Sequence, residues 1–174
     1  FPYTTLFRSA LRKRGVRPVV EGPGIAWEIQ LLERGHEIGL SRSMMVERGY
    51  QREIDETISA VKRLREAGVR LLIGGDYGLS ITPHGTNAKD LEYFVDLFGM
   101  SPAAALLCAT RDGGRAADPT GMLGTLEAET AADLVIVDGD PTKDIRVLQE
   151  VDRIVGVMKA GHFETNLLGS TTPC

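Results

Sequence analysis

The sequence predicts a mixed α/β fold, in which helices and short buried strands precede a smaller β region. Three observations support this prediction. Residues 51–67 carry apolar side chains at helical spacing, and the apolar run Leu71–Ile73 follows them directly. A further helical pattern begins near residue 88, and the segments 133–137, 153–159 and 162–164 have the composition of strands. A buried strand between two helices is typical of a parallel sheet that helices cover.

The composition is that of an ordinary globular chain and argues against several classes of function. The 174 residues are 43% hydrophobic and 25% charged, with a net charge of -4. This balance gives no support for nucleic acid or an anionic membrane as a partner, and no apolar run reaches the roughly 20 residues of a membrane span. The cysteines Cys108 and Cys174 form no metal or redox motif, and Cys108 is expected in the core. A reduced, cytoplasmic location is the default expectation.

Residues 1–9 differ from the rest of the chain. They read Phe-Pro-Tyr-Thr-Thr-Leu-Phe-Arg-Ser, without an initiator Met and without the pattern of a signal peptide. This nonapeptide resembles the translation of a common sequencing-adapter oligonucleotide. We therefore expect residues 1–9 to be an artefact that packs loosely, with the native sequence starting at residue 10 and the true N-terminus missing.

The first elements after residue 10 are a helix end, a short strand and a helix. Gly15 is placed to end the first helix, residues 16–20 are a strand, and residues 21–24 are a loop. Residues 25–34 are predicted to be a helix that ends at Gly35. Trp27 on this helix could line a pocket, although packing in the core is the commoner use of such a side chain. Residues 37–50 are expected to be irregular.

The segment 70–87 is the stretch around which the rest of the chain is organised. An amphipathic helix over residues 51–67 ends at Gly68, and the strand Leu71–Ile73 follows, bounded by the sharp turn at residues 74–75 and then by Asp76. Ligands and catalytic groups collect at the carboxyl ends of parallel strands, because the following loops converge there. Asp76 is therefore the first candidate functional residue. The alternative is a structural role, in which it hydrogen-bonds loop amides or caps a turn.

The remaining elements follow from caps, glycines and β-branched runs. Asn87 is predicted to cap a helix from residue 88 to Gly99, with Asp90 favouring its positive end. Ser101 and Pro102 start the next helix, which runs through residue 110. Residues 113–114 and 118–121 are predicted breaks. The C-terminal part is predicted to contain strands at 123–126 and 133–137, a helical turn at 145–149, and a hairpin of 153–159 with 162–164.

The order of the motifs is more informative than any one of them. Gly74-Gly75-Asp76 is followed by His84-Gly85, then by the helical motif at 101–110, and then by the motifs at 124–127, 132–141 and 157–161. This order resembles the carboxyl-terminal portion of metal-dependent amidohydrolases, in the branch of imidazolonepropionase-like and prolidase-like enzymes. The resemblance covers residues 11–166, and its strength comes from order and spacing together.

The resemblance implies a specific architecture. Residues 10–118 would be the C-terminal part of a (β/α)8 TIM barrel, containing its last two βα units, with Leu71–Gly75 as the eighth strand and Pro18–Val20 in the preceding unit. Residues 122–166 would be the C-terminal half of a small β-sandwich, and residues 167–174 a tail. Glu129 stands where the family usually has a turn glycine, so that turn is expected to be strained or rerouted.

The resemblance also implies a function. It is that of a metal-dependent hydrolase of carbon–nitrogen bonds in amides or cyclic amides, with a small-molecule amide as the substrate. Asp76 matches the catalytic aspartate of strand eight, which touches the metal and moves protons. His84 is a candidate substrate contact, and a loop-bracing histidine is the alternative. The expected cofactor is a divalent metal, zinc first, as one or two ions; a homo-oligomeric full-length enzyme is left open.

The sequence departs from the family in the residues that would complete a metal site. The family's paired histidines on strand one, its strand-four lysine or carboxylate, and its histidines on strands five and six are absent. The histidines present are His36, His84 and His162, none of them paired at ligand spacing. We therefore expect an incomplete C-terminal fragment that is inactive by itself. The alternative is a non-catalytic α/β module that binds a small molecule, with Asp76 and Asp138 bracing loops.

Overall fold

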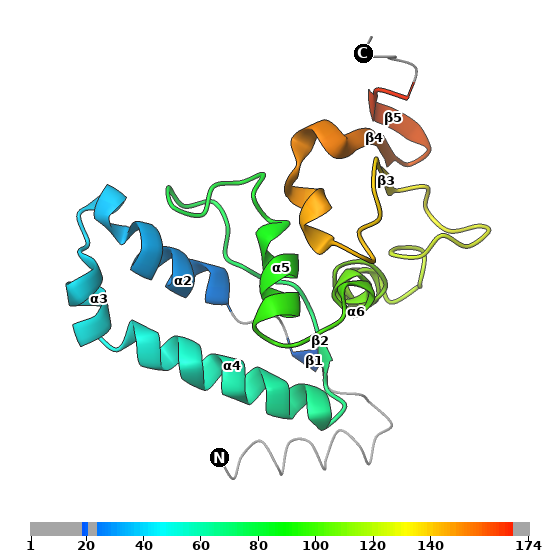
Figure 1. Cartoon of the computed structure of the whole chain (residues 1–174). Helices are drawn as coiled ribbons and strands as arrows, with labels where there is room; N and C mark the ends of the chain where they lie inside the picture. Colours follow the sequence, from blue (N-terminus) through cyan, green and yellow to red (C-terminus); the bar gives the residue numbers. More distant parts are fainter. Residues whose placement is uncertain (1–18, 21–23, 169–174) are drawn as a thin grey trace.

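The computed structural model describes residues 19–20 and 24–168. Their elements form a helical part, a pair of short parallel strands and a C-terminal three-stranded sheet (Figure 1). The predicted artefact at residues 1–9, the helix end before Gly15 and most of the predicted tail lie outside the described residues. A mixed α/β fold is therefore confirmed.

The helical part begins with two of the predicted helices and a third that was not predicted. Residues 37–50, expected to be irregular, contain a helix that the hydroxyl of Ser41 caps by accepting a hydrogen bond from the Met44 amide at 3.2 Å. Met45 on this helix is fully buried, so tertiary packing stabilises a turn that its local sequence does not predict. None of the described helices is long and apolar enough to cross a membrane. The elements are α2 (Ile25–Arg34), η1 (Gly35–Ile38), α3 (Arg42–Glu47) and α4 (Tyr50–Glu66).

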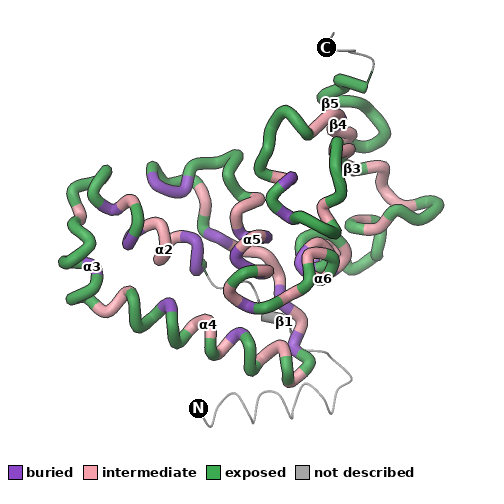
Figure 2. Tube along the Cα trace, viewed as in Figure 1, coloured by how far each residue is buried: buried purple, intermediate pink, exposed green. Residues whose placement is uncertain are grey.

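The core lies where α2, α4 and α5 (Lys89–Asp96) face one another, and Figure 2 shows the buried positions on their inner sides. Phe94 and Phe98 are its largest fully buried side chains, with ring centroids 5.1 Å apart in an edge-to-face arrangement. Aromatic pairs favour this geometry because the edge of one ring is electropositive and the face of the other electronegative. Trp27 is half-buried and packs against this core, which is the commoner of its two predicted uses.

The next helix is longer than predicted. Ser101 caps α6 (Pro102–Leu107) as expected, but the helix continues through the π-helical turn η2 (Cys108–Asp112) into α7 (Gly113–Ala117). The predicted break at residues 113–114 is therefore wrong. A Cβ atom on Gly114 would collide with the backbone carbonyl of Leu123, so glycine is needed there for close approach of two chain segments. Cys108 is buried in the core as predicted.

The parallel strand pair is short. β1 (Val19–Val20) pairs in parallel with β2 (Arg70–Leu71), with Val19 opposite Arg70. The parallel pairing agrees with the prediction, but the strand expected to reach Gly75 ends at Leu71. The chain from 72 to 78 has no strand pairing within the described residues. Strand length is set by the partner, and β1 provides two described residues.

The C-terminal part contains the predicted hairpin. The antiparallel sheet has the order β3-β4-β5, formed by β3 (Leu134–Val137), β4 (Ile154–Lys159) and β5 (His162–Asn166). Ala160 and Gly161 connect β4 to β5 with φ of 48° and 81°, as a tight two-residue hairpin turn requires. The predicted helical turn is the 3-10 helix η3 (Ile145–Gln149), followed by η4 (Val151–Arg153).

Two local expectations before this sheet have different outcomes. The strand predicted at residues 123–126 is wrong, because Gly124 has a φ of 86° and lies against the backbone carbonyl of Thr110. The strained turn predicted at Glu129 is confirmed, because this residue has a φ of 66° in the left-handed region that favours glycine. Segment 118–121 is a break, as expected, with the Asp118 carboxylate accepting hydrogen bonds from Thr120.

Candidate functional site

Asp76 lies in the loop that follows β2. A Cβ atom built on Gly24, in the loop after β1, would lie 4.0 Å from the Asp76 Cβ, so the loops after both parallel strands meet here. The Asp76 side chain is exposed, and within the described residues no hydrogen bond or ion pair reaches its carboxylate. Its backbone carbonyl accepts a hydrogen bond from the Thr82 hydroxyl at 3.5 Å. The described loop amides therefore leave the carboxylate open to solvent or a ligand.

The backbone of Asp76 is in an uncommon conformation. Its φ of 52° lies in the left-handed region, which aspartate tolerates better than most residues that carry a side chain. Such a conformation costs on the order of 1 kcal/mol and persists where the surroundings over-determine it, often at functional sites. The neighbours of Asp76 in the chain supply those surroundings.

Asp90, in the first turn of α5, lies beneath this loop and is 2% exposed. Its Oδ1 accepts a hydrogen bond from the Tyr77 hydroxyl at 3.2 Å. On the other side of Asp76 in the chain, Gly75 packs so closely that a Cβ atom there would collide with the Asp90 carboxylate and the Tyr77 ring. Gly75 is therefore needed for space, whereas the sequence suggested only a sharp turn.

Burial controls the ionisation of this pair. Desolvation raises the pKa of Asp90 to about 6, although the hydrogen bond from Tyr77 opposes the shift. Burial, followed by the nearby Asp90 charge, raises the pKa of the Tyr77 hydroxyl well above its ordinary value. Asp90 is thus a buried acid with a raised pKa, and the Tyr77 hydroxyl donates a hydrogen bond to it.

The predicted helix cap differs from the observed one. The Asn87 side chain accepts a hydrogen bond from the Gly85 amide at 3.1 Å and braces the loop, and α5 starts after Ala88 without a side-chain cap. Asp90 was predicted to favour the helix end, whereas it is buried under the Asp76 loop. A signal was present in the sequence, because Asp90 lies four positions before Phe94 on the apolar side of the helix.

His84 lies farther along the same loop. Its side chain is exposed, and a Cβ atom on Gly78 would lie 2.9 Å from the His84 Nε2, so the imidazole packs against the Gly78 backbone. This geometry favours the loop-bracing alternative. The role of His84 as a substrate contact stays a prediction.

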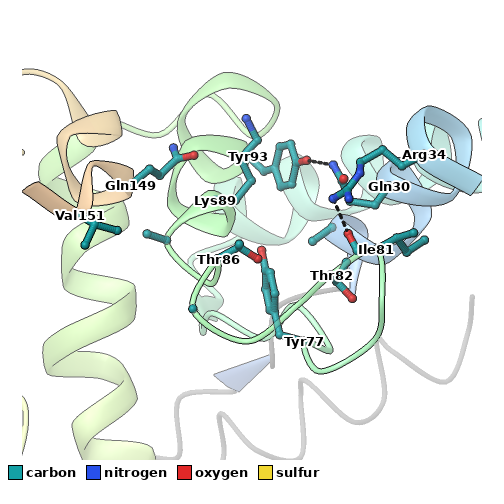
Figure 3. A pocket seen from close by; sticks show the side chains of 13 residues that line it. Gln30, Arg34, Tyr77, Ile81, Thr82, Thr86, Lys89, Tyr93, Gln149 and Val151 are labelled. Atoms are coloured by element: carbon teal, nitrogen blue, oxygen red, sulfur yellow. Dashed lines mark hydrogen bonds between the residues drawn. The ribbon is translucent and has the colours of Figure 1, made fainter. Parts of the chain in front are cut away.

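A pocket of about 360 Å³ opens beside this loop, between α2, α5 and the chain around η3 (Figure 3). The Gln30 amide donates a hydrogen bond to the Tyr93 hydroxyl at 3.1 Å, and the Arg34 guanidinium donates one to the Ile81 carbonyl at 3.2 Å. Neither Asp76 nor His84 lines this pocket. Its polar lining side chains are those of Gln30, Arg34, Tyr77, Thr82, Thr86, Lys89, Tyr93 and Gln149.

The cations at this pocket are already neutralised. The Arg34 Nε lies 2.8 Å from the Glu37 carboxylate, and the Lys89 Nζ lies 2.7 Å from the Glu92 carboxylate. An anion entering the pocket would therefore have to compete with these carboxylates. The lining offers mainly neutral hydroxyl and amide groups, which suit a small, uncharged polar molecule.

The described residues do not assemble a metal site. Among them, no three histidine, cysteine, aspartate or glutamate side chains gather in a way that could hold a metal ion. Asp76 alone does not suffice, because a catalytic zinc needs several protein ligands. Any metal held at Asp76 would take its other ligands from outside the described residues.

Comparisons with known proteins give one consistent result. The model of the amidohydrolase family matches residues 10–163. Ochratoxinase from Aspergillus niger is 31% identical over 108 residues, which are 62% of this chain and 22% of the relative. The chain therefore spans about a fifth of the length of that curated relative.

Solved structures share the fold over most of the chain. The crystal structure of A. niger ochratoxinase superposes with a TM-score of 0.71 at 25% identity, covering 90% of this chain and 33% of the other. A putative prolidase from Bifidobacterium longum has a TM-score of 0.71 at 24% identity, with coverages of 83% and 34%. A prolidase in complex with N-methylphosphonate-L-proline has a TM-score of 0.72 at 22% identity, with coverages of 90% and 36%.

Proposed function

The chain belongs to the amidohydrolase family, and from this membership we propose that the whole protein is a metal-dependent hydrolase of carbon–nitrogen bonds in amides or cyclic amides. The observation that carries the proposal is Asp76, an exposed carboxylate after a parallel strand, in a left-handed backbone conformation. A functional carboxylate needs access to its substrate, and strain of this kind is common at active sites.

The proposed architecture is that of the family. Residues 10–118 form the last two βα units of a (β/α)8 barrel, with β2 as the eighth strand, and residues 122–166 form the C-terminal half of a β-sandwich. The parallel pairing of β1 with β2 supports the first assignment, and the antiparallel β3-β4-β5 sheet supports the second. Asp76 would then lie at the carboxyl-terminal face, where barrel enzymes place their catalytic groups.

The proposed role of Asp76 is proton transfer. Its carboxylate accepts a proton as water attacks the amide carbon, so that a C–O bond forms. It then donates that proton to the departing nitrogen as the C–N bond breaks, which regenerates the carboxylate. A divalent metal, with zinc as the first expectation, is proposed for the whole protein. Asp76 is the ligand proposed among the described residues, which hold no group of three side chains that could bind the metal by themselves.

The names of the relatives guide the choice of substrates. Ochratoxinase and prolidase both occur among the similar proteins, and one prolidase structure contains an N-substituted proline. We therefore propose N-acyl amino acids, including N-acyl prolines, as the first substrates to test. His84 is retained as a proposed substrate contact.

The test is hydrolysis of these substrates by the product of the complete gene. The Asp76→Asn variant should lower kcat by about 10²–10⁴-fold, the usual contribution of a general acid–base group. Asp55→Asn, on the solvent side of α4, is the matched control and should keep full activity. No hydrolysis of any substrate, or full activity of Asp76→Asn, would contradict the proposal. Residues 10–174 alone should show no turnover and less than one zinc ion per chain in equilibrium dialysis.

The second candidate function is a non-catalytic module that binds a small molecule. The polar pocket between α2 and α5 favours it, because its volume of about 360 Å³ suits such a ligand. In that case the chain would bind small neutral polar molecules equally well with Asp76 replaced by Asn, and no substrate would be hydrolysed.

A further inference from the structure

The residues on either side of Asp76 contact the same buried carboxylate. The Tyr77 hydroxyl donates a hydrogen bond to Asp90 Oδ1 at 3.2 Å, and Gly75 packs against that carboxylate without room for a Cβ atom. Asp76 therefore projects from a loop that Asp90 contacts at the residues before and after it. No hydrogen bond from Asp90 to Asp76 itself occurs within the described residues.

We propose that Asp90 is a positioning residue, which holds the Asp76 carboxylate in its working orientation through Gly75 and Tyr77. This inference rests on the proposed function, in which Asp76 is the catalytic group. Asp90 is 2% exposed, so it acts from beneath the loop and does not meet the substrate.

The helix that carries Asp90 is packed into the core. Asp90 lies on α5, whose Phe94 and neighbouring Phe98 are fully buried and pack edge to face in the core. A helix held in this way gives Asp90 a fixed position relative to the rest of the helical part. The Asp90 carboxylate therefore connects the packed core directly to the loop that carries Asp76.

The other described ties of this loop to the core lie mainly at its far end, where Ile81 is 1% exposed and its carbonyl accepts a hydrogen bond from the Arg34 guanidinium at 3.2 Å. Between residues 72 and 82, the regular backbone contacts that the structure describes are local: the Gly78 amide donates to the Thr82 carbonyl at 2.8 Å, and the Thr82 amide donates to the Leu79 carbonyl at 3.1 Å. These bonds shape the loop, and among the described hydrogen bonds the long one from the buried Thr82 hydroxyl, at 3.5 Å, reaches the Asp76 backbone. The left-handed conformation of Asp76, with φ of 52°, therefore needs an external restraint.

A carboxylate is suited to this restraint, although it is expensive to bury. One carboxylate oxygen accepts a hydrogen bond from the Tyr77 hydroxyl. Without it, this half-buried hydroxyl would have no partner. The flat carboxylate group also packs against the Gly75 backbone, which leaves no room there for a Cβ atom. An apolar residue at position 90 would be easier to bury but would leave the Tyr77 hydroxyl unpaired.

The first measurement is amide hydrogen exchange over residues 74–82 of the complete gene product. Asp90→Ala should accelerate exchange there by about tenfold or more, because local opening becomes easier, and should leave the amides of α4 unchanged. Asp90→Asn keeps the size of the side chain and an acceptor for Tyr77, so it should restore most of the protection. Asp96→Asn, on the same helix but directed toward Arg146, is the matched control and should not change the loop.

The second measurement is the kinetic effect of the same variants. Asp90→Ala should lower kcat by about 10²-fold with little change in KM, because misplacement of a catalytic group by about 1 Å is enough for such a loss. Asp90→Asn should recover most of the activity. Tyr77→Phe, which removes the hydroxyl and keeps the ring, should fall between Asp90→Asn and Asp90→Ala.

The outcomes separate this inference from the proposed function. Unchanged loop exchange in Asp90→Ala would overturn the inference. The inference would also be overturned if Asp90→Ala loosened the loop without changing kcat while Asp76→Asn abolished activity. Asp90 would then have a structural role only. If no substrate is hydrolysed, the proposed function fails. Faster loop exchange in Asp90→Ala, with rescue by Asp90→Asn, would still support the positioning of Asp76.

Discussion

The helical part and the C-terminal sheet bury their apolar side chains to very different extents (Figure 2). Phe94 and Phe98 in the helical part are at most 1% exposed, whereas Val135 on β3 is 56% exposed and Phe163 on β5 is 43% exposed. The strand β5 is exposed at every position. The helical part is therefore stabilised by side-chain burial, and the sheet mainly by its backbone pairing.

The helical part and the C-terminal part contact each other through η3. Ile145 of η3 is 1% exposed and belongs to the same core as α5, although it lies in the C-terminal part. Ion pairs surround this contact: Arg146 Nε lies 3.1 Å from Glu92, and Arg146 Nη2 lies 2.6 Å from Asp96. The C-terminal part is thus attached to the helical core through η3. This difference predicts unequal responses to substitution.

The largest expected effect separates the two parts directly. Phe94→Ala should lower the free energy of unfolding by about 3–5 kcal/mol, because it removes a buried ring and leaves a cavity. Val135→Ala should lower it by about 0.5 kcal/mol or less, because the side chain is largely exposed already. Urea denaturation of both variants measures the two changes. Similar losses would show that the sheet is buried in the native protein and would invalidate the comparison.

A smaller effect on stability is expected from Asp90, whose carboxyl group is buried among the apolar side chains of the helical part. The folded pKa of Asp90 is about 6, above its ordinary value of 3.8. Between these values the folded protein binds more protons than the unfolded chain, so the Asp90 contribution to stability falls as the pH rises from about 4 to about 6.

Replacing Asp90 by Asn should remove this dependence. Relative to Asp90→Asn, the wild-type protein should lose on the order of 2 kcal/mol of unfolding free energy between about pH 4 and pH 7. Chemical denaturation of both proteins across this pH range tests the prediction. A constant difference between the two proteins would mean that burial does not shift the Asp90 equilibrium.

The smallest expected effect concerns the attachment between the parts. Arg146→Gln removes the ion pairs with Glu92 and Asp96, so amides of residues 145–149 should exchange faster at low salt. The change should shrink in concentrated salt, because these groups are exposed and screened. Arg153→Gln is the matched control, since Arg153 pairs with Glu150 inside the C-terminal part at 2.8 Å. An equal effect of both variants would show that the ion pairs of Arg146 do not specifically attach the C-terminal part to α5.

Elements that depend on local sequence could be predicted. The helix at 25–34, the long helix ending at Glu66 and the capped helix starting at Pro102 all follow from apolar spacing, cap residues and proline. The hairpin around Ala160 and Gly161 also follows, because a two-residue turn needs left-handed backbone conformations. The motif order further predicted the amidohydrolase family, which the match over residues 10–163 confirms.

Features that depend on a partner distant in the sequence were decided by the tertiary structure. β2 comprises Arg70 and Leu71, the two residues that pair with the described residues of β1, which lies about fifty residues earlier in the chain. The helix continues through Gly113 and Gly114 because the chain near Leu123 packs against it. Asp90 is buried because the Asp76 loop folds over α5; its place on the apolar side of the helix indicates burial, but local sequence does not indicate which segment covers it. Local propensity determines which turns and helices can form, whereas the available space and partners determine where they end and which polar groups they enclose.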